Sequence, residues 1–250
     1  MKIFSKTLLL LITGLFAQSA VQAQEWQFKF TPYIWAAAND GKSGAYGTLP
    51  NGMPFESVSD IDISFSDLAE ELDFGTMFNF TASNGDWLLY SEVTVLNIFD
   101  AKPPQPGTSD ISVEIGGEIV DVAAGHRILA RDNFNLYGYV GARYFNLEVD
   151  VESNNLGTIS TGDDFVDPFI GVHAKWQINN TFGLQGRLEV GGLDDQPSEN
   201  TLVSVVLDHN LNENWSLKYF YRMMKVDYKD NGFIYEMEVT GPGIGATYIF

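Results

Sequence analysis

The three histidines of the chain are the side chains best suited to act as general acids or bases near neutral pH. His173 lies on the polar side of an alternating segment, close to Asp167 and Lys175 in sequence. Networks of charged groups that serve only structure also contain such residues, and we favour that interpretation. His126 and His209 lie on the apolar sides of their segments, where an amphipathic ring suits an interface. No catalytic residue is predicted.

Pairs of acidic residues are the second candidate for chemistry, because clustered carboxylates bind Ca²⁺ or Mg²⁺. The pairs are Asp60 with Asp62, Glu70 with Glu71, Asp163 with Asp164, and Asp194 with Asp195. None shows the ordered ligand spacing of an EF-hand, and charge-rich loops are commonly just solvated. Nothing in the spacing singles out a carboxylate pair for hydrolysis. We predict no cofactor, with Ca²⁺ or Mg²⁺ at the acidic loops as the weaker alternative.

The segments that carry these residues are mostly predicted strands, because apolar and polar residues alternate along them with a period of two. The clearest exception is a short helix candidate at 64–74. Long and short connections alternate along the chain, which is typical of an outer-membrane β-barrel. The short ones lie near 83–86, 130–133, 178–181 and 212–215, and the others near 39–71, 100–110, 152–164, 193–199 and 230–232.

We therefore predict an all-β fold: a single antiparallel transmembrane β-barrel with short periplasmic turns and long acidic extracellular loops. The count gives ten strands, with eight as the alternative. The predicted strands are residues 26–38, 72–83, 86–99, 111–130, 133–151, 165–178, 181–192, 200–210, 214–229 and 233–250. The connection at 39–71 is long for a barrel loop, and such loops are often functional or form a plug, so its helix could fold over or into the mouth.

Large aromatic residues stand at the short-turn ends of the predicted strands, on the apolar face. Because amphipathic rings prefer the membrane interface, we predict that they form an aromatic girdle on the periplasmic side. The girdle residues are Trp26, Trp87, Phe134, Trp176, Phe182 and Trp215.

Charged residues of both signs occupy the opposite, inward faces, and we predict that they form a charge network in the lumen. Acids and bases balance there, so the excess negative charge of the chain is expected mainly in the loops. The predicted network contains Lys29, Glu92, Asp121, Arg127, Arg143, Asp167, His173, Lys175, Arg187, Glu189, Asp208, Lys218, Arg222, Glu236 and Glu238.

Residues 1–23 have the pattern of a secretory signal peptide, with two lysines, a short apolar stretch and small residues up to Ala23. We expect residues 24–250 to form the barrel domain. At the other end, apolar residues alternate up to Phe250, and we expect this strand to carry the signal that barrel-assembly machinery reads. The residues of this assembly signal are Ile244, Ala246, Tyr248 and Phe250.

The charge and cysteine content narrow the possible partners. The chain has no cysteine and a net charge of −19. Loss of the predicted leader removes two lysines and gives −21, with 12 basic against 33 acidic residues. Such a charge excludes nucleic acid as a natural partner. It also argues against docking on an anionic surface, unless divalent cations intervene.

Three stretches resemble a family of uncharacterised outer-membrane β-barrel proteins of Gram-negative bacteria. They are TPYIWAAANDGKSG, DISFSDLAEELDFGTMFNFTASNGDWLLYSEVTVL and DPFIGVHAKW. The resemblance covers most of residues 26–180. It implies a barrel in the outer membrane of the cell envelope and brings neither an activity nor catalytic residues.

The expected lumen favours a function that does not depend on a wide pore. Eight strands leave an interior filled by side chains and sixteen leave a channel, so ten strands lie close to the filled end. We expect a structural or surface-binding envelope protein that is not an enzyme. A narrow selective solute channel is the alternative, and a membrane-embedded hydrolase is the least favoured. The expected partners are outer-membrane lipid, lipopolysaccharide and the assembly machinery, and we expect a monomer.

Overall fold

The structure, a computed structural model, describes residues 25–48, 52–63, 77–101, 111–153, 157–192 and 198–250. The predicted signal peptide and the helix candidate at 64–74 lie outside these residues. No helix in the described ranges is long and apolar enough to cross a membrane. The strands are β1 (Gln27–Trp35), β2 (Ala38–Thr48), β3 (Pro54–Ile63), β4 (Met77–Ser83), β5 (Trp87–Ala101), β6 (Ile111–Arg131), β7 (Phe134–Ser153), β8 (Gly157–Gln177), β9 (Phe182–Gly191), β10 (Ser198–Asn210), β11 (Trp215–Asp230) and β12 (Phe233–Ile249).

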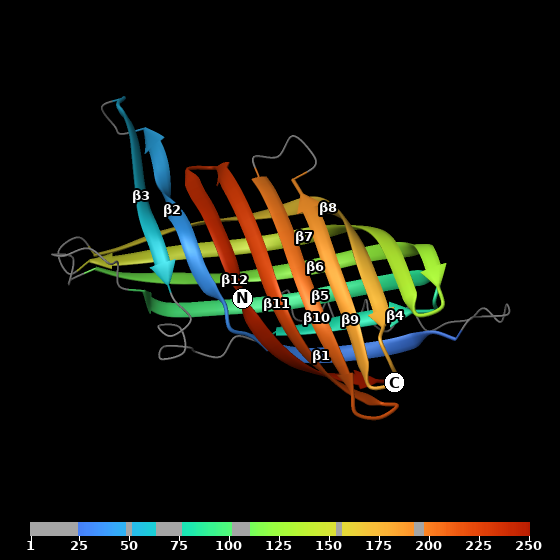
Figure 1. The fold of residues 1–250 in the computed structure, drawn as a ribbon. Coiled ribbons are helices and arrows are strands. Elements are labelled where there is room, and N and C mark those ends of the chain that lie inside the picture. Colours follow the sequence, from blue (N-terminus) through green and yellow to red (C-terminus); the bar gives the residue numbers. More distant parts are fainter. Residues whose placement is uncertain (1–24, 49–51, 64–76, 102–110, 154–156, 193–197) are drawn as a thin grey trace, which may run out of the picture.

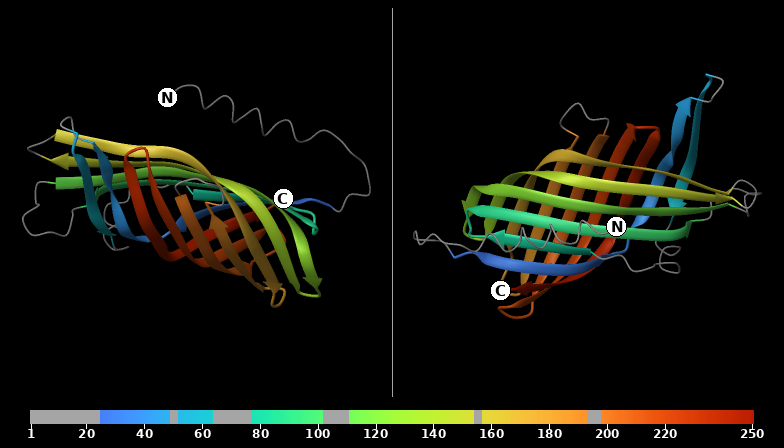
Figure 2. Two further views of the ribbon diagram at one scale, coloured as in Figure 1. Left: turned by 90° about the horizontal axis from the view of Figure 1, so that it is seen from above. Right: turned by 180° about the vertical axis from the view of Figure 1, so that it is seen from behind.

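Ten of these strands form a closed antiparallel barrel, which confirms the predicted fold class and strand number (Figure 1). β1 pairs with β4 on one side and with β12 on the other, and β4 to β12 pair in chain order. The views from above and behind show the tilted strands around a common interior (Figure 2). Closure pairs the backbone edges of the first and last barrel strands, as a bilayer requires.

The connection predicted at 39–71 is not a plain loop, and this prediction was wrong. β2 pairs with residues Phe233–Thr240 of β12, and β3 returns beside β2. Together they form a hairpin extension at the long-loop end (Figure 1). The physical reason is the length of β12, which has 17 residues against nine in β1. β2 supplies backbone partners for the part of β12 that β1 does not reach.

Gly41 of β2 stands opposite Met237 of β12, where the β12 backbone leaves no room for a side chain. Its φ is 152°, and a Cβ there would lie 2.1 Å from the carbonyl oxygen of Glu236. We expect Gly41→Ala to weaken docking of the hairpin by about 1–3 kcal/mol, because both backbone strain and a clash must be relieved. Hydrogen exchange should become faster at β2 and β3 amides while barrel amides stay protected. In the control, Gly186→Ala, the new methyl meets no atom within 4 Å. Unchanged protection in Gly41→Ala would contradict the register of β2 on β12.

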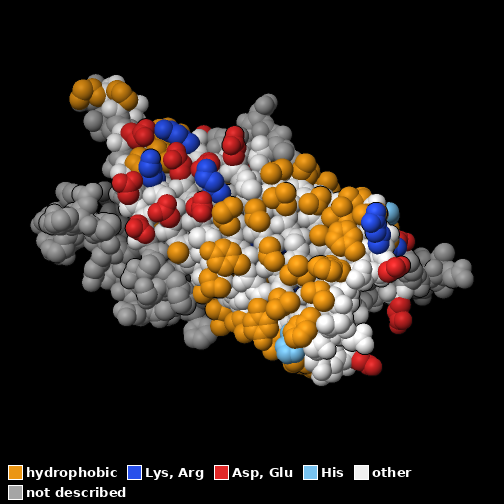
Figure 3. Space-filling view, viewed as in Figure 1, with side chains coloured by type: hydrophobic (Ala, Val, Ile, Leu, Met, Phe, Trp, Pro, Cys, Tyr) orange, Lys and Arg blue, Asp and Glu red, His pale blue; other side chains and the backbone are white. Residues whose placement is uncertain are grey.

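Exposed apolar side chains on every barrel strand form an apolar belt around the half of the barrel nearer the short turns, and Figure 3 shows one face of it. Its side chains point outward from neighbouring strands and are solvent-exposed in the isolated chain, which suits contact with lipid hydrocarbon. The belt includes Ile34, Phe80, Leu89, Val122, Val140, Ile170, Val172, Leu188, Val190, Val205, Leu207, Tyr219, Tyr221 and Ile244.

Beyond the belt, towards the long loops, the two faces of the wall exchange polarity. On β11, Tyr221 faces outward within the belt, whereas Lys225 and Lys229 are exposed further along. Met224 and Val226 are buried on the inner face at the same height. Charged side chains cover the outer surface of this part, at the upper left of Figure 3. This long-loop half therefore has the pattern of a water-exposed sheet over its own hydrophobic core.

Candidate functional site

Arg143 of β7 is fully buried in the lumen. Its guanidinium donates to both carboxylate oxygens of Asp121 at 2.7 and 2.8 Å, to Glu189 at 2.5 Å and to Asn200 at 2.9 Å. Asp121 faces it across the β6–β7 ladder, whereas Glu189 comes from β9 and Asn200 from β10. A planar fork that holds two carboxylates fixes the geometry as well as the charge.

The network continues from Glu189 to Arg187 on the same strand, where Nη2 of Arg187 lies 2.5 Å from Oε1 of Glu189. Arg187 contacts Glu92 of β5 at 3.2 Å, and Glu92 accepts a hydrogen bond from Arg222 of β11 at 2.7 Å. Tyr33 of β1 donates to the same carboxylate at 2.5 Å. We call this set the arginine layer: Arg143, Arg187 and Arg222 with Asp121, Glu189 and Glu92. It joins strands from opposite parts of the barrel wall.

Neutral polar groups complete the arginine layer. Tyr139 donates to Glu189 at 2.6 Å, and Asn200 donates to Asp167 at 2.7 Å. Ser198 also donates to Asp167. Buried charges are tolerated only when their hydrogen-bonding capacity is used. Among the described residues, the single buried side-chain polar atom without a partner is Nε of Arg222.

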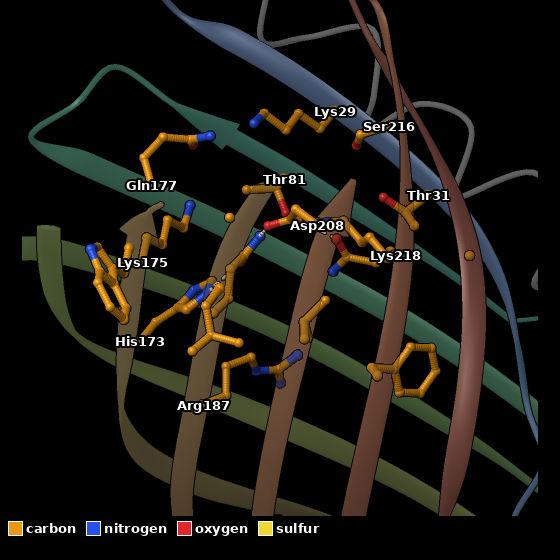
Figure 4. A pocket seen from close by; sticks show the side chains of 18 of the residues that line it. Lys29, Thr31, Thr81, His173, Lys175, Gln177, Arg187, Asp208, Ser216 and Lys218 are labelled. Carbon is orange, nitrogen blue, oxygen red and sulfur yellow. Dashed lines mark hydrogen bonds and ion pairs between the residues drawn. The ribbon is translucent and has the colours of Figure 1, made fainter. Parts of the chain in front are cut away.

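A cavity of about 310 Å³ lies between the arginine layer and the short turns. Side chains from β1, β8, β9, β10 and β11 point into it (Figure 4). We call it the lysine pocket, after the residues that dominate its charge. Its titratable and amide side chains include Lys29, Lys175, Lys218, His173, Gln185 and Asp208.

Only some of the polar side chains that line the lysine pocket bond to one another. Asp208 accepts from both Lys218 and Gln185, and Oε1 of Gln185 lies 2.8 Å from Nε2 of His173. Nζ of Lys175 lies 5.3 Å from the centre of the Tyr137 ring. Positive charge therefore exceeds negative charge at this level of the lumen.

On the other side of the arginine layer, an apolar cap fills the lumen. Aromatic stacking fixes part of it: the Phe165 ring lies 4.0 Å from that of Tyr228 and 4.8 Å from that of Phe145, measured between centroids. Such packing leaves little space for water. The buried residues of the cap include Trp35, Phe145, Leu147, Met224, Val226, Tyr228, Phe233, Tyr235, Met237 and Val239.

A polar contact lies at the outer edge of the apolar cap. Asp163 accepts hydrogen bonds from Tyr228 at 2.5 Å and from Asn231 at 2.8 Å. Burial raises the pKa of Asp163, but these hydrogen bonds and one from the Asp164 backbone outweigh it, so the pKa lies below its usual value. Burial and the adjacent carboxylate raise the pKa of Tyr228. The contact links β8 to the β11–β12 turn and favours an ionised Asp163.

The comparison with solved structures shows the same fold. The outer-membrane protease OmpT from Escherichia coli matches 91% of this chain and 97% of its own, with a TM-score of 0.53 and 12% identity. The chain has the outer-membrane β-barrel fold. The identity is too low to transfer an activity.

Weaker matches belong to the same class of outer-membrane barrels. Ail of Yersinia pestis covers 90% of this chain and 98% of its own, with 13% identity and a TM-score of 0.36. The translocator domain of the autotransporter NalP from Neisseria meningitidis covers 88% of both chains, with 12% identity and a TM-score of 0.41. No family model and no curated protein matches the sequence.

The outer-membrane barrel brings most of the predicted lumen residues together. The arginine layer, Asp167 and the lysine pocket contain twelve of them. Arg127 lies at the short-turn rim and pairs with Asp86 at 2.5 Å. Tyr33, Tyr139 and Asn200 were missed, because an uncharged side chain on a polar face gives no sign of which partner it will meet.

Glu236 and Glu238 are not in the lumen, and that part of the prediction was wrong. Both lie on the outer face of β12, where Glu236 is exposed and stands opposite Lys42 of β2. Both glutamates lie on the same face of β12 as Ile244, because they are an even number of residues away from it. This face contacts lipid near Ile244 and water near the glutamates. Polarity indicates the inner face only within the apolar belt.

The predicted girdle residues lie near the short turns of the barrel. Trp87, Trp176, Phe182 and Trp215 are exposed on the outer face, and Trp26 and Phe134 are half-buried. The outward histidines pack against this set: the His126 ring lies 4.8 Å from Trp87, and the His209 ring 4.9 Å from Phe182. Among the described residues, none of the three histidines forms an ion pair with a carboxylate, and His173 pairs with the Gln185 amide instead.

The acidic pairs do not converge in the described part of the chain. Asp60 and Asp62 are exposed on β3, while Asp163 and Asp164 point to opposite faces of β8. The other two pairs lie outside the described residues. Within the described ranges, no group of three or more His, Cys, Asp or Glu side chains is placed to hold a metal ion.

The predicted assembly strand closes the barrel. Ile244, Ala246 and Tyr248 lie on the outer face of β12, and the Tyr248 ring lies 5.0 Å from that of Trp215. The Phe250 backbone amide donates to the carbonyl oxygen of Phe28 at 3.0 Å. This residue therefore extends the seam between β12 and β1.

Proposed function

We propose that the protein is a closed-lumen barrel of the outer membrane that serves as a structural or surface-binding envelope protein. In this proposal, the short turns face the periplasm and the long-loop half stands outside the cell among lipopolysaccharide. The observation that carries the proposal is the two-level closure of the lumen, by the arginine layer and by the apolar cap.

Two features support a role at the outer surface. β2 and β3 enlarge the sheet beyond the apolar belt, and the outer face of this sheet is charged. Acids predominate there: Asp40, Glu56, Asp60, Asp62, Glu199, Asp227, Glu236 and Glu238 accompany Lys42, Lys225 and Lys229. A large solvated sheet with one prevailing sign of charge can steer cationic partners towards the surface. Lipid contact along the apolar belt and assembly through β12 complete the proposed partners.

Recording from planar bilayers tests the closed lumen. We expect purified full-length protein to insert without stepwise ion conductance, because an ion would have to cross a paired arginine layer and an apolar cap. A trimeric porin inserted in the same bilayers confirms that steps can be resolved. Reproducible steps that scale with protein concentration would overturn the closed lumen and favour the narrow solute channel.

Labelling of single cysteines tests the orientation, because the chain has no native cysteine. We expect Lys229→Cys, on the outer face of the long-loop half, to react in intact cells with a bulky impermeant maleimide. Asn212→Cys, in the exposed β10–β11 turn, should react only after the outer membrane is permeabilised. The reverse pattern would contradict the proposed orientation.

A further inference from the structure

Among the described residues, the lysine pocket opens to solvent on one side only, at the short turns. The arginine layer and the apolar cap close it on one side, and its lining includes Asp132 and Asn133 of the β6–β7 turn at the other. Continuous ladders between neighbouring barrel strands close its wall. A ligand must therefore enter from water at the short-turn end. Entry sideways from lipid would require strands to separate.

The charges of this pocket are unbalanced. Lys218 is paired with Asp208, but Lys29 and Lys175 have neither an ion pair nor a hydrogen bond to a described residue. The ammonium groups of all three lysines repel one another. Arg187 lines the pocket too, yet its charge is already matched by Glu92 and Glu189.

The excess of positive charge is confined to the lysine pocket, whereas the chain as a whole is acidic. The whole chain carries a net charge of −19, so a general surplus of lysine does not explain it. Like charges held together in a partly desolvated space are costly unless counter-charge is supplied. Arg222 also lines the cavity, and its buried Nε has no hydrogen-bond partner among the described residues.

We propose that the lysine pocket binds a small, soluble, multivalent oxyanion bearing phosphate or carboxylate groups, which enters from the short-turn side. Lys29 and Lys175 would supply two ammonium groups. Each ammonium group is a point charge whose N–H groups donate hydrogen bonds to the oxygens of an oxyanion. Hydroxyl and amide groups of Thr81, Asn135 and Ser216 line the same space and suit the remaining oxygens. A volume of about 310 Å³ lies at the lower end of the range for small-molecule sites.

Isothermal titration of the full-length protein in detergent tests this site with two probes, inorganic pyrophosphate and citrate. We expect saturable binding of at least one probe, weakened by salt. Lys29→Gln and Lys175→Gln should each raise the dissociation constant about tenfold or more. The control Lys225→Gln removes an exposed lysine that pairs with Asp227 on the outer face, and it should leave the affinity unchanged. Because the first two variants relieve charge repulsion, they should fold as well as wild type.

Three results would overturn the proposal: no saturable binding of either probe at millimolar concentration, equal losses in the control variant, or unchanged affinity in both pocket variants. Binding of citrate alone or pyrophosphate alone would identify the preferred oxyanion.

Chemical protection locates the bound anion independently of affinity. Lys29→Cys would be the only thiol in the chain, and a negatively charged methanethiosulfonate should modify it in folded protein. Saturating probe should slow this modification several-fold, whereas modification of Lys225→Cys should proceed at the same rate with or without probe. Equal rates at Lys29→Cys with and without probe would place the anion elsewhere. The test uses purified protein, so it stands apart from the proposed orientation and surface role.

Discussion

Replacing Arg143 by alanine is expected to lower the free energy of unfolding by about 3–5 kcal/mol. The guanidinium is fully buried and holds Asp121 and Glu189 together. Its removal leaves the buried Asp121 carboxylate without its counter-charge and leaves Glu189 with Arg187 alone. The amide oxygen of Asn200 also loses its donor, while its amide nitrogen keeps the hydrogen bond to Asp167. Guanidinium or urea unfolding in detergent, followed by tryptophan fluorescence and by heat-modifiable migration on gels, measures the change.

Arg127→Ala is the matched control for this experiment. Arg127 also pairs with an aspartate at 2.5 Å, but both side chains are partly exposed at the short-turn rim. Water can reach the Asp86 carboxylate once the Arg127 guanidinium is gone, so we expect a loss of about 1 kcal/mol or less. Comparable losses for Arg127→Ala and Arg143→Ala would show that the lumen is wet at the arginine layer. That result would contradict the closed-lumen proposal.

Placing arginine at Val140 is expected to cost about 2–4 kcal/mol and to reduce the amount of folded protein in outer membranes. Val140 is 62% exposed on the outer face of β7, within the apolar belt, so the new cation would face hydrocarbon. The measurement is the fraction of heat-modifiable, membrane-extracted protein, together with unfolding in lipid vesicles.

Glu148→Arg is the control on the same strand and the same face. Glu148 is exposed and lies beyond the belt, where the outer face meets water, so an arginine there should have little effect. Tyr139→Arg would be a poor comparison, because Tyr139 is buried and bonded to Glu189. Equal defects at positions 140 and 148 would contradict the placement of the belt, and normal assembly of Val140→Arg would contradict lipid contact at that face.

The sequence alone determined the strand-based architecture. Apolar and polar residues alternate with a period of two wherever one face of a strand meets lipid and the other meets a polar lumen. Near the short turns, this periodicity therefore shows which segments form the barrel wall and which side chains point inward. Short and long connections then predict the order of the strands. The same alternation identifies Arg143, Glu189 and Arg222 as lumen residues, because a charge on the lipid face would be too costly.

Only the tertiary structure decided which charges pair and where the barrel continues above the belt. Arg143 meets Glu189 from β9, and Arg222 meets Glu92 from β5, because barrel closure and strand stagger set their heights. No local pattern encodes those heights. β2 was hidden because its glycines give a weak alternation, and pairing with β12 stabilises it. Glu236 was misplaced because an outer face in water accepts charge, so the rule that polar side chains point inward ends where the lipid ends.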